Sequence, residues 1–393
     1  MKIMNPAVWL VALTAPLFGQ ALFGQALKME PAPSPAGPDS LQANWSTAAD
    51  GSPLLSWVEK SKDGFDTLRY AVHRGSAWSE ARTIAAHRHF FHHPAELPEV
   101  IALSGGPLLA HWVELPKEDS EAEFLYVSAS ADGVHWSTPR VAHKDTSLVQ
   151  HGLGSMAASG PREASLIWLQ ALKGEDGPVT LMRTVVSAEG AVVKEETLDP
   201  DVCACCPTSV VRTAKGLLVA YRDHTPANIR DISTIRLENG HWSASKNIFP
   251  DNWKIDACPV NAATAAAKGD SVAVAWYTAS SDKARVEMAL SSDDGATFGK
   301  ASTVSTGQAY GYTSTAMDDS GGAIVSWLER GGGAARVLVR RVSAAGVAGP
   351  VLQVAQGDRA ALGYPRMLKA GGETWIAWGN GDSGSKVSVA ILK

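Results

Sequence analysis

Charged residues are scarce in this chain of 393 residues: Asp, Glu, Lys and Arg make up 19% of it, and the formal net charge is −5. Such a balance gives no electrostatic reason to expect nucleic acid or an anionic membrane surface as a partner. Beyond the N-terminal region, no apolar stretch reaches the length of a membrane span. Cysteine is also rare, with four residues between positions 203 and 258, so any disulfide or thiolate metal site is confined to that part of the chain.

Apolar residues (45%) and glycine (36 residues) are abundant, and they follow a repeat. A short apolar phrase with a central aromatic residue, first seen at 54–59 as Leu-Leu-Ser-Trp-Val-Glu, returns every 51 to 56 residues. Its aromatic anchors are Trp57, Trp112, Trp168, Tyr221, Trp276, Trp327 and Trp378. Seven copies at one period are typical of a repeat architecture.

Each repeat predicts four short strands. The anchor phrase is followed by a second run rich in β-branched residues, a Gly-containing turn, and two further short runs. Four strands per unit of roughly 50 residues are typical of a β-propeller blade. We therefore predict an all-β fold, a single seven-bladed propeller of four-stranded antiparallel blades over residues 41–393, with six blades as the alternative.

The N-terminus resembles an export signal. Residues 1–26 combine a lone Lys2, an apolar core and small residues suited to cleavage, and an uncleaved anchor is the alternative. The chain is therefore expected to be secreted or periplasmic, with no membrane span once the signal is cleaved. Residues 27–40 are proline-rich and predict a linker or a blade-closing strand.

Ring closure leaves one strand to be found. The seventh repeat ends at Lys393 directly after its third strand, so we expect residues near 26–33 to supply the outer strand, or that edge to be left bare. Pro31 and Pro33 suit an outer edge better than an inner strand.

One turn motif carries a family resemblance. The segment Ser-Ser-Asp-Asp-Gly-Ala-Thr-Phe at 291–298 resembles the Asp-box of sialidases, and a second copy at 129–136 has Ala131 where the Asp is expected. From about residue 40 onward the chain resembles secreted bacterial sialidase-like propellers, often labelled exo-α-sialidase. Its distinctive segments are 203–206, 221–223, 229–232, 256–261 and 363–366.

The resemblance implies a set of catalytic residues on the axial face, where loops that enter the inner strands gather. A sialidase needs three arginines for the substrate carboxylate, a tyrosine nucleophile with a glutamate, and an aspartate as acid and base. The candidates for these roles are Arg222, Arg230 and Arg366 for the clamp, Tyr312 or Tyr364 with Glu329 for the nucleophile and its partner, and Asp223 or Asp231 for the acid. No Phe-Arg-Ile-Pro motif occurs near the first blade, and sialidases have six blades. The structural alternative is that each arginine at 222 and 230 pairs with the aspartate that follows it and fixes one long loop.

The cysteines allow two interpretations. In an oxidising compartment they predict two disulfides, one of them joining Cys258 to the loop that holds Cys203, Cys205 and Cys206. Alternatively, the four thiolates bind copper or zinc, with His151 or the histidine cluster at 87–93 as a further ligand.

These residues together predict a binding protein with its site on the axial face. The ligand is expected to be an anionic glycan, because of the arginines, or a metal ion, because of the cysteines. An exo-acting glycosidase of sialidase type and a scaffold for protein partners remain the alternatives. The polar residues two positions after each anchor are expected either to line the central channel or to cap strand ends.

Overall fold

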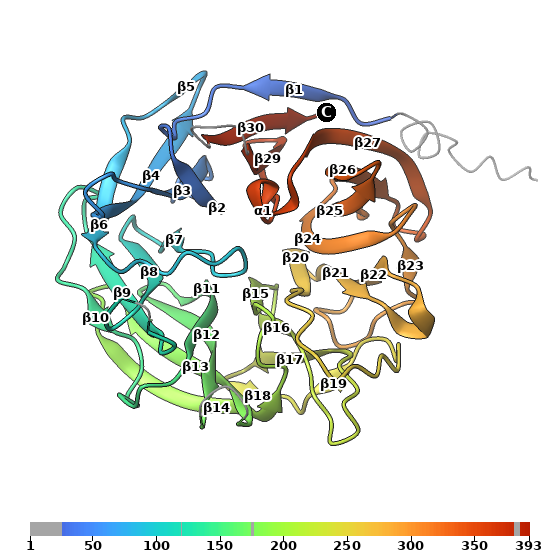
Figure 1. Cartoon of the computed structure of the whole chain (residues 1–393), viewed down its shortest axis with the longest axis horizontal. Helices are drawn as coiled ribbons and strands as arrows, with labels where there is room; N and C mark the ends of the chain where they lie inside the picture. Colours follow the sequence, from blue (N-terminus) through green and yellow to red (C-terminus); the bar gives the residue numbers. More distant parts are fainter. Residues whose placement is uncertain (1–25, 119, 174–176, 381–385) are drawn as a thin grey trace, which may run out of the picture.

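The computed structural model describes residues 26–118, 120–173, 177–380 and 386–393. Within these residues, seven antiparallel sheets surround a central axis, as Figure 1 shows in a view down that axis. The predicted seven-bladed propeller is confirmed, and the six-bladed alternative is wrong. The predicted signal segment lies almost wholly outside the described residues. None of the described helices is long and apolar enough to cross a membrane.

In every blade the chain runs from the inner strand outward. The first four blades are β2–β6 (Ser40–Thr47, Pro53–Glu59, Asp66–Arg74, Ala77–Trp78, Arg82–His87), β7–β10 (Glu99–Ala102, Leu108–Glu114, Phe124–Ser130, Arg140–Val141), β11–β14 (His151–Gly160, Glu163–Ala171, Val179–Ser187, Val192–Val202) and β15–β19 (Ser209–Arg212, Gly216–Arg222, Ile232–Glu238, His241–Trp242, Lys246–Asn247).

The remaining blades follow the same order. They are β20–β23 (Thr264–Lys268, Ser271–Thr278, Arg285–Ser291, Ser302–Thr303), β24–β27 (Ala309–Met317, Ala323–Gly331, Ala334–Val342, Ala348–Gly357) and β28–β30 (Arg366–Ala370, Glu373–Asn380, Lys386–Leu392). A 3-10 turn, η2 (Ser280–Asp282), and a short helix, α1 (Arg359–Leu362), lie in connecting loops.

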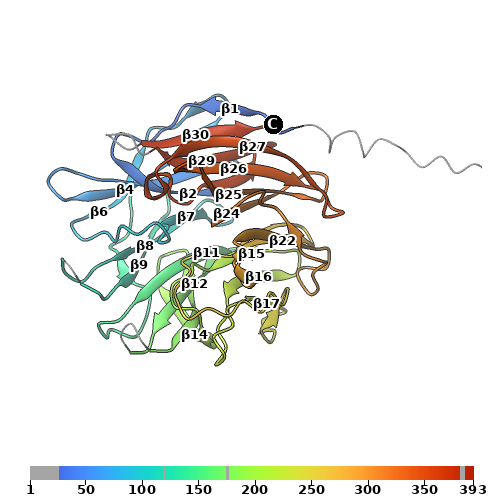
Figure 2. The ribbon, with the colours of Figure 1, turned by 45° about the vertical axis from the view of Figure 1, so that its right-hand side comes forward.

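The N-terminal segment closes the ring. Strand β1 (Met29–Ala32) pairs antiparallel with β30, Met29 opposite Leu392 and Ala32 opposite Val389, and both views show the two strands side by side at the outer edge (Figures 1 and 2). Pro31 lies in this edge strand, where a missing N–H costs no ladder bond on the outer side. The seventh blade is thus assembled from both ends of the chain.

The aromatic anchors lie on the second strand of each blade and pack between blades. Five of the tryptophans, at 57, 112, 168, 276 and 327, have no exposed surface. The indole N–H of Trp57, Trp112 and Trp327 donates to the glutamate two residues later, at 2.6–3.0 Å. The polar residues after these three anchors therefore satisfy buried indoles and cap strand ends, and they do not line the channel.

The Asp-box at 291–298 is a tight turn on the opposite face. Asp293 accepts hydrogen bonds from the Thr297 N–H (2.9 Å), the Thr297 hydroxyl (2.6 Å) and the Ser291 hydroxyl (2.7 Å). Gly295 has φ +75°, and a Cβ there would lie 2.0 Å from Leu218 Cδ1, so any other residue would strain the backbone and displace Leu218. In the second copy, Ala131 stands at the position of the motif's aspartate, and Asp132, the next residue, fills its role. Asp132 accepts hydrogen bonds from the N–H groups of Val134 and His135.

Replacing Asp293 with alanine should lower the free energy of unfolding by about 1 kcal/mol, because three local hydrogen bonds to one half-exposed carboxylate are lost. Urea titration followed by tryptophan fluorescence measures the change. Asp319→Ala, which removes an exposed carboxylate on the same face, is the control and should change stability by less than about 0.5 kcal/mol. Equal effects of the two substitutions would contradict a folding role for the Asp-box.

Candidate functional site

The loops that enter the inner strands and those that follow the anchor strands lie together on one face, here called the axial face. Contacts across it join distant segments: the Tyr364 hydroxyl donates to the Val260 carbonyl at 2.5 Å, and the Tyr312 N–H donates to Asn261 Oδ1 at 2.8 Å. Helix α1 lies at the inner edge of the ring beside this face (Figure 1). Residues far apart in the sequence therefore share one rim, as the repeat order predicts.

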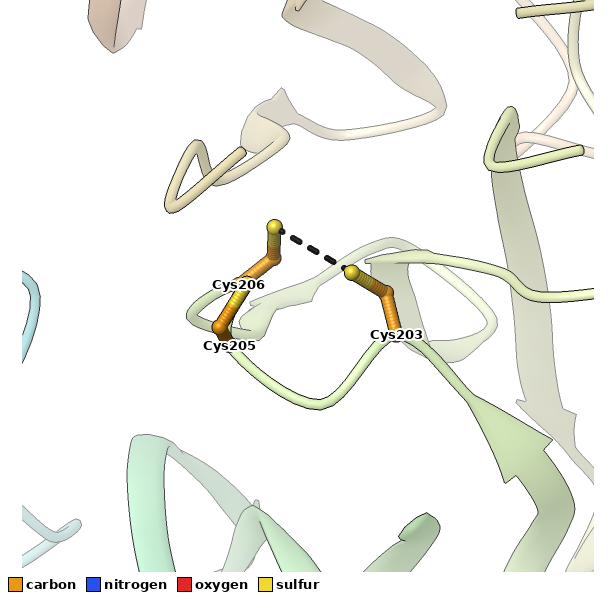
Figure 3. Close-up of side chains that lie close together, drawn as sticks. All are labelled: Cys203, Cys205 and Cys206. Atoms are coloured by element: carbon orange, nitrogen blue, oxygen red, sulfur yellow. Dashed lines mark hydrogen bonds between the residues drawn. The ribbon is translucent and has the colours of Figure 1, made fainter. Parts of the chain in front are cut away.

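All four cysteines gather on this face. The thiols of Cys203, Cys205 and Cys206, in the loop between β14 and β15, lie within 4.8 Å of one another, and Figure 3 shows the 3.6 Å contact between the sulfurs of Cys203 and Cys206. The thiol of Cys258, from the loop before β20, contacts that of Cys205. Burial is graded, because Cys203 and Cys206 are 1% and 2% exposed whereas Cys258 is exposed.

The predicted disulfides are not present. All four cysteines, which the structure describes, are free, and the 3.6 Å separation of Cys203 and Cys206 is well beyond the roughly 2 Å of a disulfide bond. The contact of Cys258 with the neighbouring loop does occur, but between free thiols.

Positive charge faces these sulfurs. Arg230 Nη1 donates to Cys203 Sγ at 3.2 Å, and the Asn261 N–H donates to Cys206 Sγ at 3.4 Å. Hydrogen bonds from the other two thiols of the loop hold the pKa of Cys203 well below its usual value, with the guanidinium groups of Arg222 and Arg230 acting in the same direction. Burial raises the pKa of Cys206. The cluster is therefore able to hold anionic sulfur.

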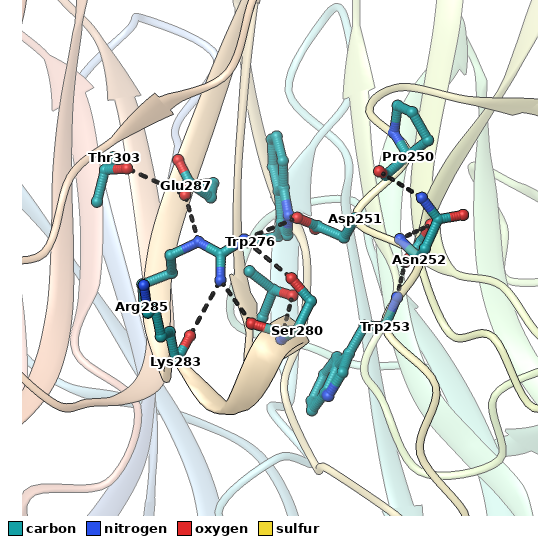
Figure 4. Close-up of polar contacts among 12 residues, drawn as sticks. Pro250, Asp251, Asn252, Trp253, Trp276, Ser280, Lys283, Arg285, Glu287 and Thr303 are labelled. Atoms are coloured by element: carbon teal, nitrogen blue, oxygen red, sulfur yellow. Dashed lines mark hydrogen bonds and ion pairs between the residues drawn. The ribbon is translucent and has the colours of Figure 1, made fainter.

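The loop that carries Cys258 is fixed at both ends. At its start, Asp231 accepts the N–H groups of Asn252 and Trp253, both at 2.9 Å. Asp251 binds the Trp276 indole (2.6 Å) and Arg285 (3.3 Å), as Figure 4 shows.

At the end of this loop, Val260 has φ +48°, a strained value for a β-branched residue. The side chain of the next residue, Asn261, bonds Pro259 O, Tyr310 O and Tyr312 N around it.

Arg222 is a structural residue. Its side chain is 2% exposed, and its N–H groups donate to the backbone carbonyls of Arg230 (2.7 Å), Tyr277 (2.8 Å) and Asn261. Arg230 donates to Ile255 O and to Cys203. Neither arginine forms an ion pair with the aspartate that follows it in the described structure, so the expected pairs are wrong, although both arginines do fix the long loop.

The structure does not bring the sialidase-type residues together as a catalytic set. The Tyr364 hydroxyl donates to a backbone carbonyl, while Glu329 binds Trp327, the N–H groups of Thr306 and Gly307, and Arg336. Asp231 is occupied by the N–H groups of its loop. Asp223 accepts the Ser233 hydroxyl at 2.7 Å, and burial raises its pKa. Tyr312 stacks on Tyr364 with centroids 4.1 Å apart.

The histidines considered as metal ligands have other partners. His151 is fully buried between His143, stacked at 3.8 Å, and Trp168, and its Nδ1 bonds Glu123 O. In the cluster at 87–93, His92 bonds Asp66 and Gln42. No histidine among the described residues joins the three-cysteine group.

A cavity of about 460 Å³ lies along the axis between the inner strands. Hydroxyl groups line much of it, from Ser155, Thr208, Ser209, Thr264 and Ser314. At its far end Asp319 pairs with Lys268 (3.0 Å) and Lys369 (2.8 Å). At its axial end lie Tyr364 and Arg366.

Arg366 differs from the other two candidate arginines. Its Nε donates to Asn44 Oδ1 at 3.1 Å, and no carboxylate forms an ion pair with it within the described ranges. Burial lowers the pKa of this guanidinium, while Glu99 acts in the opposite direction. Glu99 itself accepts the Met156 N–H at 2.8 Å and lies 3.6 Å from His111. A half-buried cation therefore faces the channel without a direct counterion.

Sequence reasoning missed a pair of buried acids on the same face. Glu96 is fully buried, and Glu123 is nearly so. One carboxylate oxygen of each lies 2.8 Å from the position that a Cβ of residue 152 would take, which explains the glycine there. Burial raises the pKa of Glu96 to about 8 and that of Glu123 to about 7, and each side chain has one oxygen without a hydrogen-bond partner. Nothing in the local sequence distinguishes these glutamates from exposed ones.

A family model described as a BNR repeat-like domain matches residues 61–372. No curated protein matches the chain.

Similar solved structures share the fold at low identity. An α-L-arabinofuranosidase of Fusarium graminearum, solved as a mutant with an iminosugar inhibitor, is 13% identical, with 93% of this chain and 98% of that one covered and a TM-score of 0.51. A protein of unknown function from Dyadobacter fermentans is also 13% identical, over 93% and 97% of the two chains, with a TM-score of 0.50. An ulvan lyase bound to a glucuronate–sulfated rhamnose unit is 8% identical, with 93% of this chain and 98% of that one covered and a TM-score of 0.55.

Proposed function

We propose a function for this chain, which belongs to the BNR repeat-like family of sialidase-like β-propellers. Its axial channel binds the acidic end of an anionic glycan. The observation that carries the proposal is Arg366, a half-buried arginine that lines the channel without an ion pair in the described residues. A carboxylate or sulfate would supply the missing counterion through charge-assisted hydrogen bonds.

The channel walls suit a sugar in other respects. Hydroxyl side chains can exchange hydrogen bonds with those of a saccharide, and Trp45, Leu97 and Tyr364 offer apolar surface to its C–H faces. A volume of about 460 Å³ accommodates one or two sugar units. Two proteins of similar fold are an arabinofuranosidase and an ulvan lyase, which is consistent with a carbohydrate ligand.

The proposal is binding without sialidase-type hydrolysis. Hydrolysis of that type needs a tyrosine activated by a glutamate, and here Tyr364 donates to Val260 O while Glu329 belongs to the sixth blade's own hydrogen bonds. We also propose that the protein is exported and that its leader at 1–26 is cleaved. The propeller then spans residues 41–393, with a closing segment within 27–40.

The proposal is tested by calorimetric titration of the purified chain with uronate- and sialate-terminated oligosaccharides and their neutral counterparts. The wild type should prefer the anionic ligands. Arg366→Ala should weaken their binding at least about 30-fold, roughly 2 kcal/mol, because a partly buried charge pair with the ligand is lost. Arg359→Ala, which removes an exposed arginine of the same face outside the channel, should have little effect.

Two outcomes would overturn this function. One is equal affinity for anionic and neutral ligands, or an unchanged affinity in Arg366→Ala. The other is release of a free sugar acid during the titration, which would show catalysis instead of binding.

A further inference from the structure

The cysteine cluster is separate from the ligand site proposed above and has its own chemistry. Three thiols converge from one short loop, and their sulfurs lie within 4.8 Å of one another. The donors are all sulfur, because the described histidines lie elsewhere and no described carboxylate joins the group. Sulfur donors select soft cations and disfavour Ca²⁺ or Mg²⁺, which take oxygen ligands.

The sulfurs of Cys203 and Cys206 are held in place by groups outside their loop. The Cys203 N–H donates to Arg222 O at 3.1 Å, and its thiol accepts from Arg230 at 3.2 Å. The Cys206 thiol accepts the Asn261 N–H at 3.4 Å. Packing and hydrogen bonds therefore preorganise the sulfurs, so a metal ion would not need to order a mobile loop.

The local charge suits a complex of several thiolates with a monovalent ion. Three thiolates and one Cu(I) carry a net charge of −2, and the guanidinium group of Arg230 donates to the Cys203 sulfur at 3.2 Å. Buried anionic sulfur without such a cation would be costly.

The number of converging sulfurs discriminates between metals. Structural zinc sites almost always take four ligands at the corners of a tetrahedron. Here the mutually close set has three members, and Cys258, on a different loop and exposed, contacts Cys205 alone among the thiols of the cluster. A three-sulfur set suits Cu(I), which is soft and accepts low coordination numbers.

We infer that Cys203, Cys205 and Cys206 form a three-coordinate Cu(I) site on the axial face, with Cys258 outside the ligand set at its solvent side. Binding of one copper ion releases to solvent the protons that the three sulfurs still carry, with no change of oxidation state. The exposed thiol of Cys258 can bind a copper ion transiently as the ion enters or leaves the site.

The test uses the whole purified chain under anaerobic, reducing conditions. A free-thiol count comes first, and four thiols per chain are expected. Titration with Cu(I) in competition with bicinchoninate should then show one equivalent bound, with a thiolate-to-copper absorption band. Zn²⁺ should bind at least 100-fold more weakly than Cu(I).

Variants separate a three-sulfur from a four-sulfur site. Cys203→Ser and Cys206→Ser should each weaken Cu(I) binding by 100-fold or more, whereas Cys258→Ser should weaken it less than 10-fold. Circular dichroism confirms that each variant is folded. Cys205→Ser should weaken Cu(I) binding in the same way, and because Cys205 is partly exposed this substitution disturbs packing less. Arg366→Ala should bind Cu(I) normally, which separates this site from the glycan proposal.

The inference would be overturned by wild-type protein with four free thiols that binds no Cu(I). It would also be overturned by a thiol count of zero that reducing agents do not raise, or by tighter zinc binding that Cys258→Ser removes as completely as Cys203→Ser does.

Discussion

The variant Glu96→Gln should be markedly more stable than the wild type at pH 9 and about equally stable at pH 5. Glu96 is fully buried; one carboxylate oxygen accepts the Leu153 N–H at 2.5 Å, and the other has no partner. Burial, and then the nearby Glu123, raise its pKa to about 8 from the ordinary value of 4.5. The folded protein therefore holds a proton at neutral pH that the unfolded chain releases.

The sign of the pH dependence follows from this difference. Between pH 4.5 and 8 the folded state binds more protons than the unfolded state, so stability falls as pH rises through that window. Above pH 8 both states are ionised and this contribution no longer changes. A glutamine keeps the shape and the acceptor oxygen but cannot ionise, and its amide can donate to the unpartnered oxygen of Glu123.

The expected gain at pH 9 is on the order of 3 to 5 kcal/mol, from a shift of several units at about 1.4 kcal/mol each. Urea unfolding at pH 5, 7 and 9 measures it. Glu121→Gln, which changes an exposed glutamate close in sequence to Glu123, is the matched control and should leave the pH profile unchanged. Parallel profiles for Glu96→Gln and the wild type would show that Glu96 is already ionised in the folded protein.

Trp327→Ala should lower the free energy of unfolding by about 3 to 5 kcal/mol, because a large side chain is removed from a fully buried position between blades. A second loss follows from its polar contact. The indole N–H donates to Glu329 at 3.0 Å, and that carboxylate also holds the N–H groups of Thr306 and Gly307 and the side chain of Arg336. Removing the indole leaves this buried carboxylate with one donor fewer.

The matched control is Trp378→Ala. Trp378 occupies the anchor position of the seventh blade, but it is partly exposed and lines a second cavity of about 290 Å³. Its loss should cost no more than about half as much, as chemical denaturation of both variants would show. Equal losses would mean that the anchor position itself, and not its burial, sets the stability.

Much of the fold follows from local pattern. The anchor period and strand alternation predicted seven blades, and the unfinished seventh repeat pointed to the segment near residues 26–33, where β1 is found. These features are readable because strand spacing and blade order are set by residues close in sequence. The same order placed the cysteine loop and the 249–262 loop on one face.

What each side chain does there was decided by tertiary contacts. Arg222, Arg230 and Arg366 look alike in sequence, yet Arg222 is occupied by backbone carbonyls, Arg230 faces a thiol, and Arg366 faces the channel. His151 is enclosed by aromatic rings, and the acids at 96 and 123 meet only in the fold.

The sequence by itself therefore determined the architecture and the face on which the candidate residues gather, and it left the closing of the ring between two alternatives. Only the tertiary structure decided which of them are free to meet a ligand. The reason is physical: a repeat records short-range periodicity, whereas the availability of a charged group depends on hydrogen-bond partners and burial supplied by blades distant along the chain.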